Sequence, residues 1–175
     1  MQLAQLLCLS LGVAAVGGMA CPKSSAFIHA SCQTVATASA SCSTVRAEVL
    51  ARVAGQYGQW HDPHNNGTYT VLDESAQDTL QLKRLTGDGK YTDKVTLTLA
   101  NASDTACTVS GCSESQVTSV LDYSTNYCNI RMLTCGSADG CKPVNSDWAL
   151  TETSVSPSKG AGKDPSACLK VLAAA

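Results

Sequence analysis

Gly58-Gln-Trp-His-Asp-Pro-His-Asn-Asn-Gly-Thr-Tyr69 separates two parts of the chain that differ in periodicity. Before this stretch, Val45, Val49 and Val53 recur at the spacing of one helix face. After it, apolar and polar residues alternate with the period of strands. The Asp-Pro and Asn-Gly dipeptides within the stretch favour turns. The sequence therefore predicts a corner at which a helix is followed by a sheet.

An amphipathic helix is predicted for residues 41–55. Ser43 or Thr44 can cap its start, and Gly55 is suited to its end. Three charged side chains are assigned to its exposed face: Arg46, Glu48 and Arg52. Residues 21–40 are rich in Ala, Ser and Thr, and they are interpreted either as a loose arm or as the first turns of a helix.

Alternating segments after the corner predict an antiparallel sheet. They comprise residues 68–72, 79–85, 94–99, 107–109, 116–121, 127–133 and 148–155. The predicted fold class is α+β, with one N-terminal amphipathic helix packed on a five- to seven-stranded antiparallel β-meander, or on a partly closed barrel. Disulfides are expected to staple it.

The length of 175 residues suits one domain. Residues 1–20 are predicted to be a signal peptide, because a short apolar stretch precedes several small residues. Residues 21–155 are predicted to form a single α+β domain. Residues 156–175 are predicted to form a flexible C-terminal tail that is tied by Cys168.

The protein is therefore expected to be secreted and extracellular. A net charge of -2 without runs of Lys or Arg argues against nucleic acid or an anionic membrane surface as a partner. No later apolar stretch is long enough to span a bilayer. The expected partner is an unknown extracellular ligand or protein, and no cofactor is predicted.

Ten cysteines in a secreted chain predict a disulfide framework. Cys8 lies in the predicted signal peptide. Short, turn-rich loops predict two local bridges, Cys107–Cys112 and Cys135–Cys141. The partners of four further cysteines stay open: Cys32, Cys42, Cys128 and Cys168. The odd one, Cys21, is interpreted as a free thiol or as part of an intermolecular bridge.

The tetrapeptide His61-Asp62-Pro63-His64 is the strongest candidate for a polar site. Two imidazoles and a carboxylate can hold a divalent metal or act as acid and base if another strand supplies Glu114 or Asp122. The competing interpretation is a turn, in which Asp62 and Asn65 bind turn amides and both rings lie at the surface. No catalytic residue or metal ligand is assigned.

Two segments match the acceptor pattern for N-glycosylation, Asn66-Gly-Thr68 and Asn101-Ala-Ser103. Both lie in predicted turns, where an acceptor is exposed. The protein is therefore predicted to be a glycoprotein in a host that glycosylates secreted proteins. A glycan on Asn66 would crowd His64.

Four blocks of the sequence carry a family resemblance: Trp60–Tyr69, Thr86–Lys94, Cys112–Ser119 and Ser124–Cys128. Together they resemble an uncharacterised family of small secreted cysteine-rich proteins from microalgae and related protists. The likeness covers residues 45 to about 150. Because that family has no assigned activity, the resemblance implies no functional residue.

A second resemblance concerns Gly58-Gln-Trp60 and Leu121-Asp-Tyr-Ser-Thr-Asn-Tyr127, which are similar to two motifs of lipocalins. It implies an eight-stranded barrel that carries a small apolar ligand. The cavity of such a barrel would be lined by five apolar side chains: Leu80, Leu82, Val95, Leu97 and Val120.

Three functions remain as hypotheses. The leading one is a secreted, disulfide-stabilised binding or interaction module without catalytic activity, because no nucleophile motif such as Gly-x-Ser-x-Gly is present. The alternatives are the lipocalin-like carrier and a small metal-dependent or acid–base hydrolase that uses His61 and His64. The hydrolase requires both imidazoles to point into one cleft with a carboxylate close by.

Overall fold

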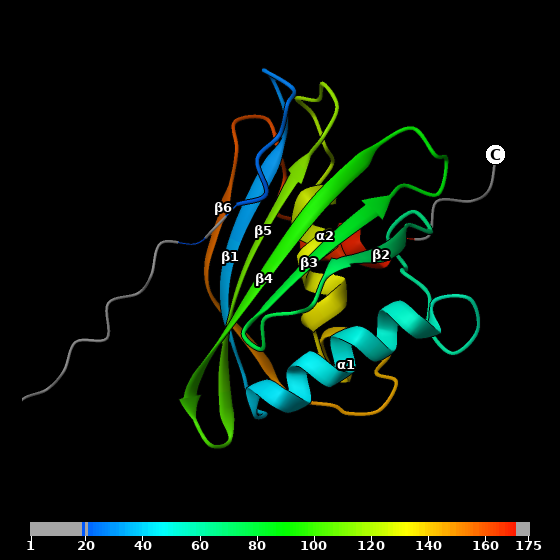
Figure 1. The fold of residues 1–175 in the computed structure, drawn as a ribbon. Helices are drawn as coiled ribbons and strands as arrows, with labels where there is room; N and C mark the ends of the chain where they lie inside the picture. Colours follow the sequence, from blue (N-terminus) through cyan, green and yellow to red (C-terminus); the bar gives the residue numbers. More distant parts are fainter. Residues whose placement is uncertain (1–18, 20, 171–175) are drawn as a thin grey trace, which may run out of the picture.

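The computed structural model describes Met19 and residues 21–170 (Figure 1). Apart from Met19, the predicted signal peptide at 1–20 lies outside the described residues, as do residues 171–175 of the predicted tail. The main elements are β1 (Ser31–Ala38), α1 (Cys42–Gly55), β2 (Thr68–Asp73), β3 (Thr79–Leu85), β4 (Thr92–Ser103), β5 (Ala106–Ser115), α2 (Thr125–Thr134) and β6 (Leu150–Pro157). Two short 3-10 helices, η1 (Ser137–Asp139) and η2 (Pro165–Leu169), complete the described elements.

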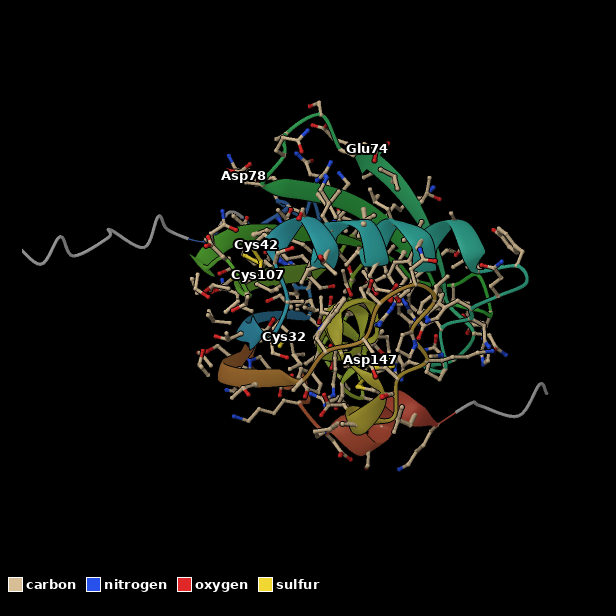
Figure 2. All side chains as sticks on the ribbon, turned by 90° about the horizontal axis from the view of Figure 1, so that it is seen from below. Cys32, Cys42, Glu74, Asp78, Cys107 and Asp147 are labelled. Atoms are coloured by element: carbon tan, nitrogen blue, oxygen red, sulfur yellow. A yellow bond between two sulfur atoms is a disulfide. The ribbon has the colours of Figure 1, made fainter. Side chains whose placement is uncertain are left out.

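The strands form a six-stranded antiparallel sheet in the order β2-β3-β4-β5-β1-β6. Strands β2 to β5 form the predicted meander. The sheet curves around α2, and α1 lies across the end of the same inner side (Figures 1 and 2). The α+β fold class is therefore confirmed. The prediction of a single N-terminal helix is wrong, because β1 precedes α1 and a second helix, α2, follows the meander.

The interpretation of residues 21–40 was wrong where β1 lies. Its four inward positions carry small or weakly hydrophobic side chains, Cys32, Thr34, Ala36 and Ala38, all of them buried. The alternation is therefore faint in the sequence. Pairing with β5 on one edge and with β6 on the other satisfies the backbone of this strand.

The segments at 116–121 and 127–133 are not strands. The first is irregular, and the second lies within α2. Helix α2 packs against the sheet, α1 and η2, and nearly all its residues are buried. Because such a helix has no solvent-exposed face, its sequence lacks the amphipathic period that would distinguish it from a strand.

The hydrophobic core fills the space between the inner face of the sheet and the two helices. Leu82 and Val95 face each other across β3 and β4 and pack with Val45 and Val49 of α1. Four of the five side chains expected to line a lipocalin cavity belong to this core: Leu80, Leu82, Val95 and Leu97. The fifth, Val120, is half exposed. In this structure the four core side chains pack with residues of the helices and do not line a cavity of a barrel.

Four disulfides cross-link the described residues: Cys21–Cys112, Cys42–Cys107, Cys128–Cys168 and Cys135–Cys141. The local bridge Cys135–Cys141 is as predicted, but the predicted Cys107–Cys112 bridge is wrong. Both residues lie on one strand, β5, about 17 Å apart along an extended chain. Figure 2 shows Cys107 joined to Cys42 at the start of α1.

Two expectations about single cysteines are also wrong. Cys21 is bonded to Cys112 and is therefore not free. Cys32, which was assigned to a disulfide, is unpaired and buried within the described part of the chain. The tail is tied by Cys168, as expected, and its partner is Cys128 in α2. Four disulfides are consistent with an extracellular protein.

Helix α1 buries two of the charged side chains that were assigned to its exposed face. Glu48 and Arg52 form an ion pair at 2.9 Å with neither side chain exposed. The Glu48 carboxylate also accepts hydrogen bonds from three consecutive backbone N–H groups: Val144 at 2.7 Å, Asn145 at 2.7 Å and Ser146 at 3.0 Å. The assignment failed because a carboxylate can be buried when a loop supplies enough donors.

Within the described residues, no helix is both long and apolar enough to cross a membrane.

Candidate functional site

The predicted corner contains a buried ion pair. Asp62 Oδ2 accepts hydrogen bonds from Arg84 Nε at 2.8 Å and Nη2 at 2.6 Å, and both side chains are fully buried. Asp62 Oδ1 accepts from the backbone N–H of His64 at 2.9 Å, which is the turn bond that the competing interpretation expected. Burial alone would lower the pKa of Arg84, but the Asp62 carboxylate raises it above its ordinary value. The bonds between Asp62 and Arg84 thus join the corner to β3.

Arg84 is not among the site residues predicted from the sequence. It follows Leu80 and Leu82 at the spacing of two that marks the inward face of β3, so the alternation itself was the available signal. Gly67 makes room for it, because a Cβ at position 67 would collide with the guanidinium. The guanidinium of Arg84 therefore connects β3 to the corner residues Asp62, His64 and Asn65.

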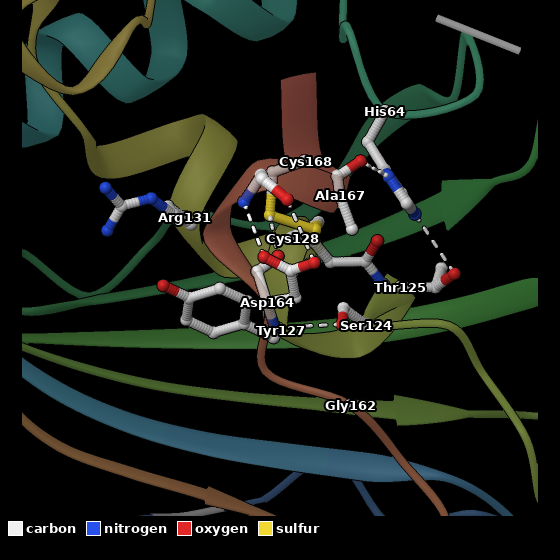
Figure 3. The surroundings of a disulfide bond; sticks show 12 residues. His64, Ser124, Thr125, Tyr127, Cys128, Arg131, Gly162, Asp164, Ala167 and Cys168 are labelled. Atoms are coloured by element: carbon white, nitrogen blue, oxygen red, sulfur yellow. Dashed lines mark hydrogen bonds between the residues drawn. A yellow bond between two sulfur atoms is a disulfide. The ribbon is translucent and has the colours of Figure 1, made fainter. Parts of the chain in front are cut away.

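The two histidines of the tetrapeptide do not converge. His61 is exposed, whereas His64 is buried. His64 Nδ1 lies 3.0 Å from the carbonyl oxygen of Ala167, and Nε2 lies 3.1 Å from Thr125 Oγ1 (Figure 3). A carbonyl only accepts, so Nδ1 carries the proton and Nε2 of the neutral ring accepts from the Thr125 hydroxyl. The expectation that both rings lie at the surface is therefore wrong for His64.

Burial lowers the pKa of the His64 imidazole below its ordinary value. The Arg84 guanidinium acts in the same direction, while the hydrogen bond to Ala167 opposes it. With both nitrogens engaged and the neutral form favoured, His64 joins three segments of the chain. It is not placed to exchange protons with a ligand.

Neither of the two carboxylates proposed to complete the polar site bonds to the His64 ring, whose partners are Ala167 and Thr125. Glu114 on β5 lies 3.7 Å from His29 Nε2, beside the Cys21–Cys112 disulfide. Cys21, Cys112 and Glu114 have potential metal-ligating atoms close together. The two sulfurs are bonded to each other, however, and a metal is bound by a free thiolate, so these three residues do not form a metal site. The structure therefore does not gather the five predicted site residues around one cavity.

Asp122 is the predicted site residue that lines a cleft. Its Oδ1 accepts from the backbone N–H groups of Ser124 at 3.1 Å and Gly162 at 3.0 Å. Its Oδ2 accepts from the backbone N–H and the side-chain amide of Asn126, both at 3.0 Å. Each oxygen thus has two donors from the protein itself. Asp122 shapes the start of α2 and has little capacity left for a ligand.

The cleft has a volume of about 660 Å³ and lies where β3 and β5 end and β2 and β4 begin. Its walls come from residues 65–66, from the β3–β4 turn at 86–91 and from the loop at 119–125. The volume falls within the range of about 300–1,000 Å³ that is usual for small-molecule sites. None of the described residues that line it is a histidine or a cysteine.

The rim of the cleft carries exposed apolar side chains. Tyr91 is 44% exposed, Leu121 66% and Tyr123 79%. The chain's two buried tyrosines, Tyr69 and Tyr127, bond carboxylates through their hydroxyls. Solvent-exposed aromatic side chains beside a pocket offer contact area to a ligand.

A buried polar layer lies beneath the cleft. Asp93 at its base accepts from Ser115 Oγ at 2.7 Å and from the Asn129 side-chain amide at 2.8 Å. Asn126 of α2 donates to Ser115 Oγ at 3.3 Å and accepts from Ser113 Oγ at 2.7 Å. Side chains of α2, β4 and β5 thus hold one another at the base of the cleft.

The backbone around the cleft adopts left-handed conformations at non-glycine residues. Asn65 and Asn66 have φ values of 49° and 53° on one wall, and Tyr123 and Ser124 have 50° and 71° on the other. These conformations cost free energy at residues with a side chain, and they persist only where the surrounding structure imposes them. The Gly87 N–H donates to the carbonyl of Asn65 at 3.1 Å. This bond joins residues 65–66 to the β3–β4 turn at 86–91, and together they form the first wall of the cleft.

The second wall is held by a C-terminal strap, residues 158–170. Besides the bond from Gly162 to Asp122, the Asp164 N–H donates to Ser124 Oγ at 3.0 Å. Figure 3 shows how the Cys128–Cys168 disulfide and His64 hold η2 of the strap against the start of α2. The predicted sequon residue Asn66 is exposed and lines the opposite wall.

Comparison of the chain with protein-family models, with curated proteins and with solved structures finds no match.

Proposed function

We propose that this protein is an extracellular, disulfide-stabilised module that binds a ligand in the cleft without chemically changing it. The observation that carries the proposal is a cleft of ligand size whose walls are fixed by the protein's own bonds. A preformed site loses little conformational entropy when it binds. The cleft thus combines volume, rigidity and exposed contact area.

The chemistry of the base favours binding over catalysis. The oxygens of Asp93 and Asp122 accept hydrogen bonds from protein donors, so neither carboxylate is presented as a free base. A general base must reach a substrate proton directly or through one water. His64 is turned away into its bonds with Ala167 and Thr125.

A fragment screen followed by two-dimensional NMR of backbone amides tests this function. We expect the amide shifts produced by fragment hits to cluster at residues 65–66, 87–91 and 119–125. Leu121→Ala removes an apolar rim contact and should weaken these hits several-fold. Val120→Ala is the matched control, because Val120 is similarly exposed, at 50%, and does not line the cleft.

Two outcomes would overturn the proposal. One is a set of shifts that cluster at the shallower hollow beside the end of α1, which Ala54, Tyr57 and Asn145 help to line. The other is an equal effect of the two substitutions, which would mean that the rim of the cleft is not the contact surface.

A further inference from the structure

We propose that the ligand of the cleft is a neutral oligosaccharide, an inference that rests on the proposed function of the cleft as a binding site. Three features meet there: exposed tyrosine rings at the rim, uncharged hydroxyl and amide groups on the walls, and charged groups that are already occupied. Each feature restricts the class of ligand, and a hydroxyl-rich ring with an apolar C–H face satisfies all three.

The rings of Tyr91 and Tyr123 supply the apolar part of the contact. Both rings are exposed at the rim and belong to different walls of the cleft. The face of an aromatic ring carries partial negative charge and attracts the weakly positive C–H groups of a sugar ring. Two tyrosines on opposite walls suit a ligand with more than one such ring.

The walls supply groups that both donate and accept hydrogen bonds. Ser119 Oγ accepts from the Ala30 N–H at 3.0 Å, which leaves its own proton available. Thr125 donates to His64 and can accept from a ligand. Asn66 adds an exposed amide. Sugar hydroxyls likewise donate and accept, so these groups match them in either direction.

The charges of the cleft disfavour ionic ligands. Lys90, the cationic side chain that lines it, lies 3.4 Å from the Asp88 carboxylate, and Asp93 and Asp122 at the base would repel an anion. A cation finds both oxygens of Asp122 taken by two donors each and each oxygen of Asp93 taken by one. The third carboxylate, Asp88, is bonded to Thr86 and Lys90. A peptide that adds to the sheet as a strand needs a free strand edge. Of the four strands that meet at the cleft, β3, β4 and β5 are paired on both sides, and β2 alone lies at an edge.

Calorimetric titration of the purified, unglycosylated protein provides the test. The neutral probes are maltohexaose, cellohexaose, hexa-N-acetylchitohexaose and mannohexaose. The ionic probes are hexagalacturonate and tetramethylammonium, and the peptide probe is hexa-alanine made soluble by an uncharged polyether tail. We expect binding of at least one neutral hexasaccharide. We expect no measurable binding of hexagalacturonate, tetramethylammonium or the hexa-alanine probe.

Matched tyrosine variants locate the binding. Tyr123→Ala and Tyr91→Ala should each weaken the hexasaccharide about tenfold, while Tyr91→Phe retains the ring and most of the affinity. Tyr57→Ala is the control, because Tyr57 is 84% exposed and lies outside the cleft. Circular dichroism of each variant checks that it is folded.

The inference is overturned if none of the four neutral probes binds, if an ionic or peptide probe binds instead, or if Tyr57→Ala is as damaging as Tyr123→Ala. The fragment screen separates this failure from failure of the proposed function. If fragments cluster in the cleft and no saccharide binds there, the ligand class is wrong and the binding site stands. If no saccharide binds and the fragments cluster at the hollow beside α1 instead of in the cleft, both are wrong.

Discussion

The Arg84 guanidinium lies 2.6 Å from the Asp62 carboxylate, and neither side chain is exposed to solvent. The pair joins the turn after α1 to β3. The same guanidinium donates to Asn65 Oδ1 at 2.9 Å and so also reaches the wall of the cleft. Removal of one partner of such a pair leaves the other charge buried without compensation.

Asp62→Asn should therefore lower the free energy of unfolding by about 3–5 kcal/mol. The remaining Arg84 charge would be buried beside a neutral amide. Urea unfolding followed by fluorescence of the two tryptophans measures the change. Lys90→Met, which breaks the exposed pair with Asp88, is the control and should leave stability unchanged within error. Equal stability of Asp62→Asn and the unaltered protein would contradict this account.

Glu48→Gln should release the loop that follows η1. Burial disfavours ionisation of Glu48, yet hydrogen bonds from Val144, Arg52 and the next two backbone amides lower the pKa of the carboxyl below its ordinary value. A carboxyl whose folded-state pKa is lowered stabilises the fold above its unfolded pKa, and this contribution is lost as the pH falls through the folded value. Hydrogen exchange should show faster amides at Val144–Ser146 in the variant. Unchanged exchange there would refute this role.

His64→Asn should flatten the dependence of stability on pH. Burial lowers the pKa of His64, so in the unaltered protein the unfolded chain binds a proton that the folded chain does not. The stability that comes from neutral His64 is present above pH about 6.5 and is lost as the pH falls below it. Asn keeps a donor for Ala167 and does not titrate. His61→Asn, at an exposed position, is the control, and a slope that persists in His64→Asn would contradict the assignment.

Cys32 should resist alkylation until the protein unfolds. The thiol is buried on β1, and burial raises its pKa to about 12, so thiolate is scarce at neutral pH. Peptide mass mapping should find Cys32 unmodified after iodoacetamide treatment of the folded protein. After denaturation without reductant, the same peptide should carry the label. Modification in the folded state, or a disulfide-linked Cys32 peptide, would show a different arrangement.

A glycan on Asn66 should block the cleft, whereas a glycan on Asn101 should not. Asn66 lines the cleft. Asn101 lies on β4 eight residues beyond Asp93 at the base of the cleft, about 27 Å along an extended strand. In protein from a glycosylating host, Asn66→Gln should increase the affinity for the fragments that bind the cleft, and Asn101→Gln should not change it. A gain from Asn101→Gln alone would contradict this placement.

The local sequence determined the parts of the fold whose signals lie within a few residues. The helical repeat of Val45, Val49 and Val53 and the alternation in β3 and β4 both predict the observed elements. Turn chemistry placed the corner near Asn65 and Asn66, where the backbone is left-handed. The bridge between Cys135 and Cys141 spans 6 positions, and the turn-rich loop between them predicts it. These features depend on backbone propensity and period, which a short window contains.

Only the tertiary structure decided the long-range relationships. Small inward residues conceal β1, whose place between β5 and β6 depends on its neighbours. The pairing of Cys42 with Cys107 joins residues that are 65 positions apart. The cleft gathers residues 65–66, 86–91 and 119–125, and no one of these segments forms a wall alone. The reason is physical: burial, ion pairing and cavities arise between segments, and their free energy depends on contacts that the order of residues does not state.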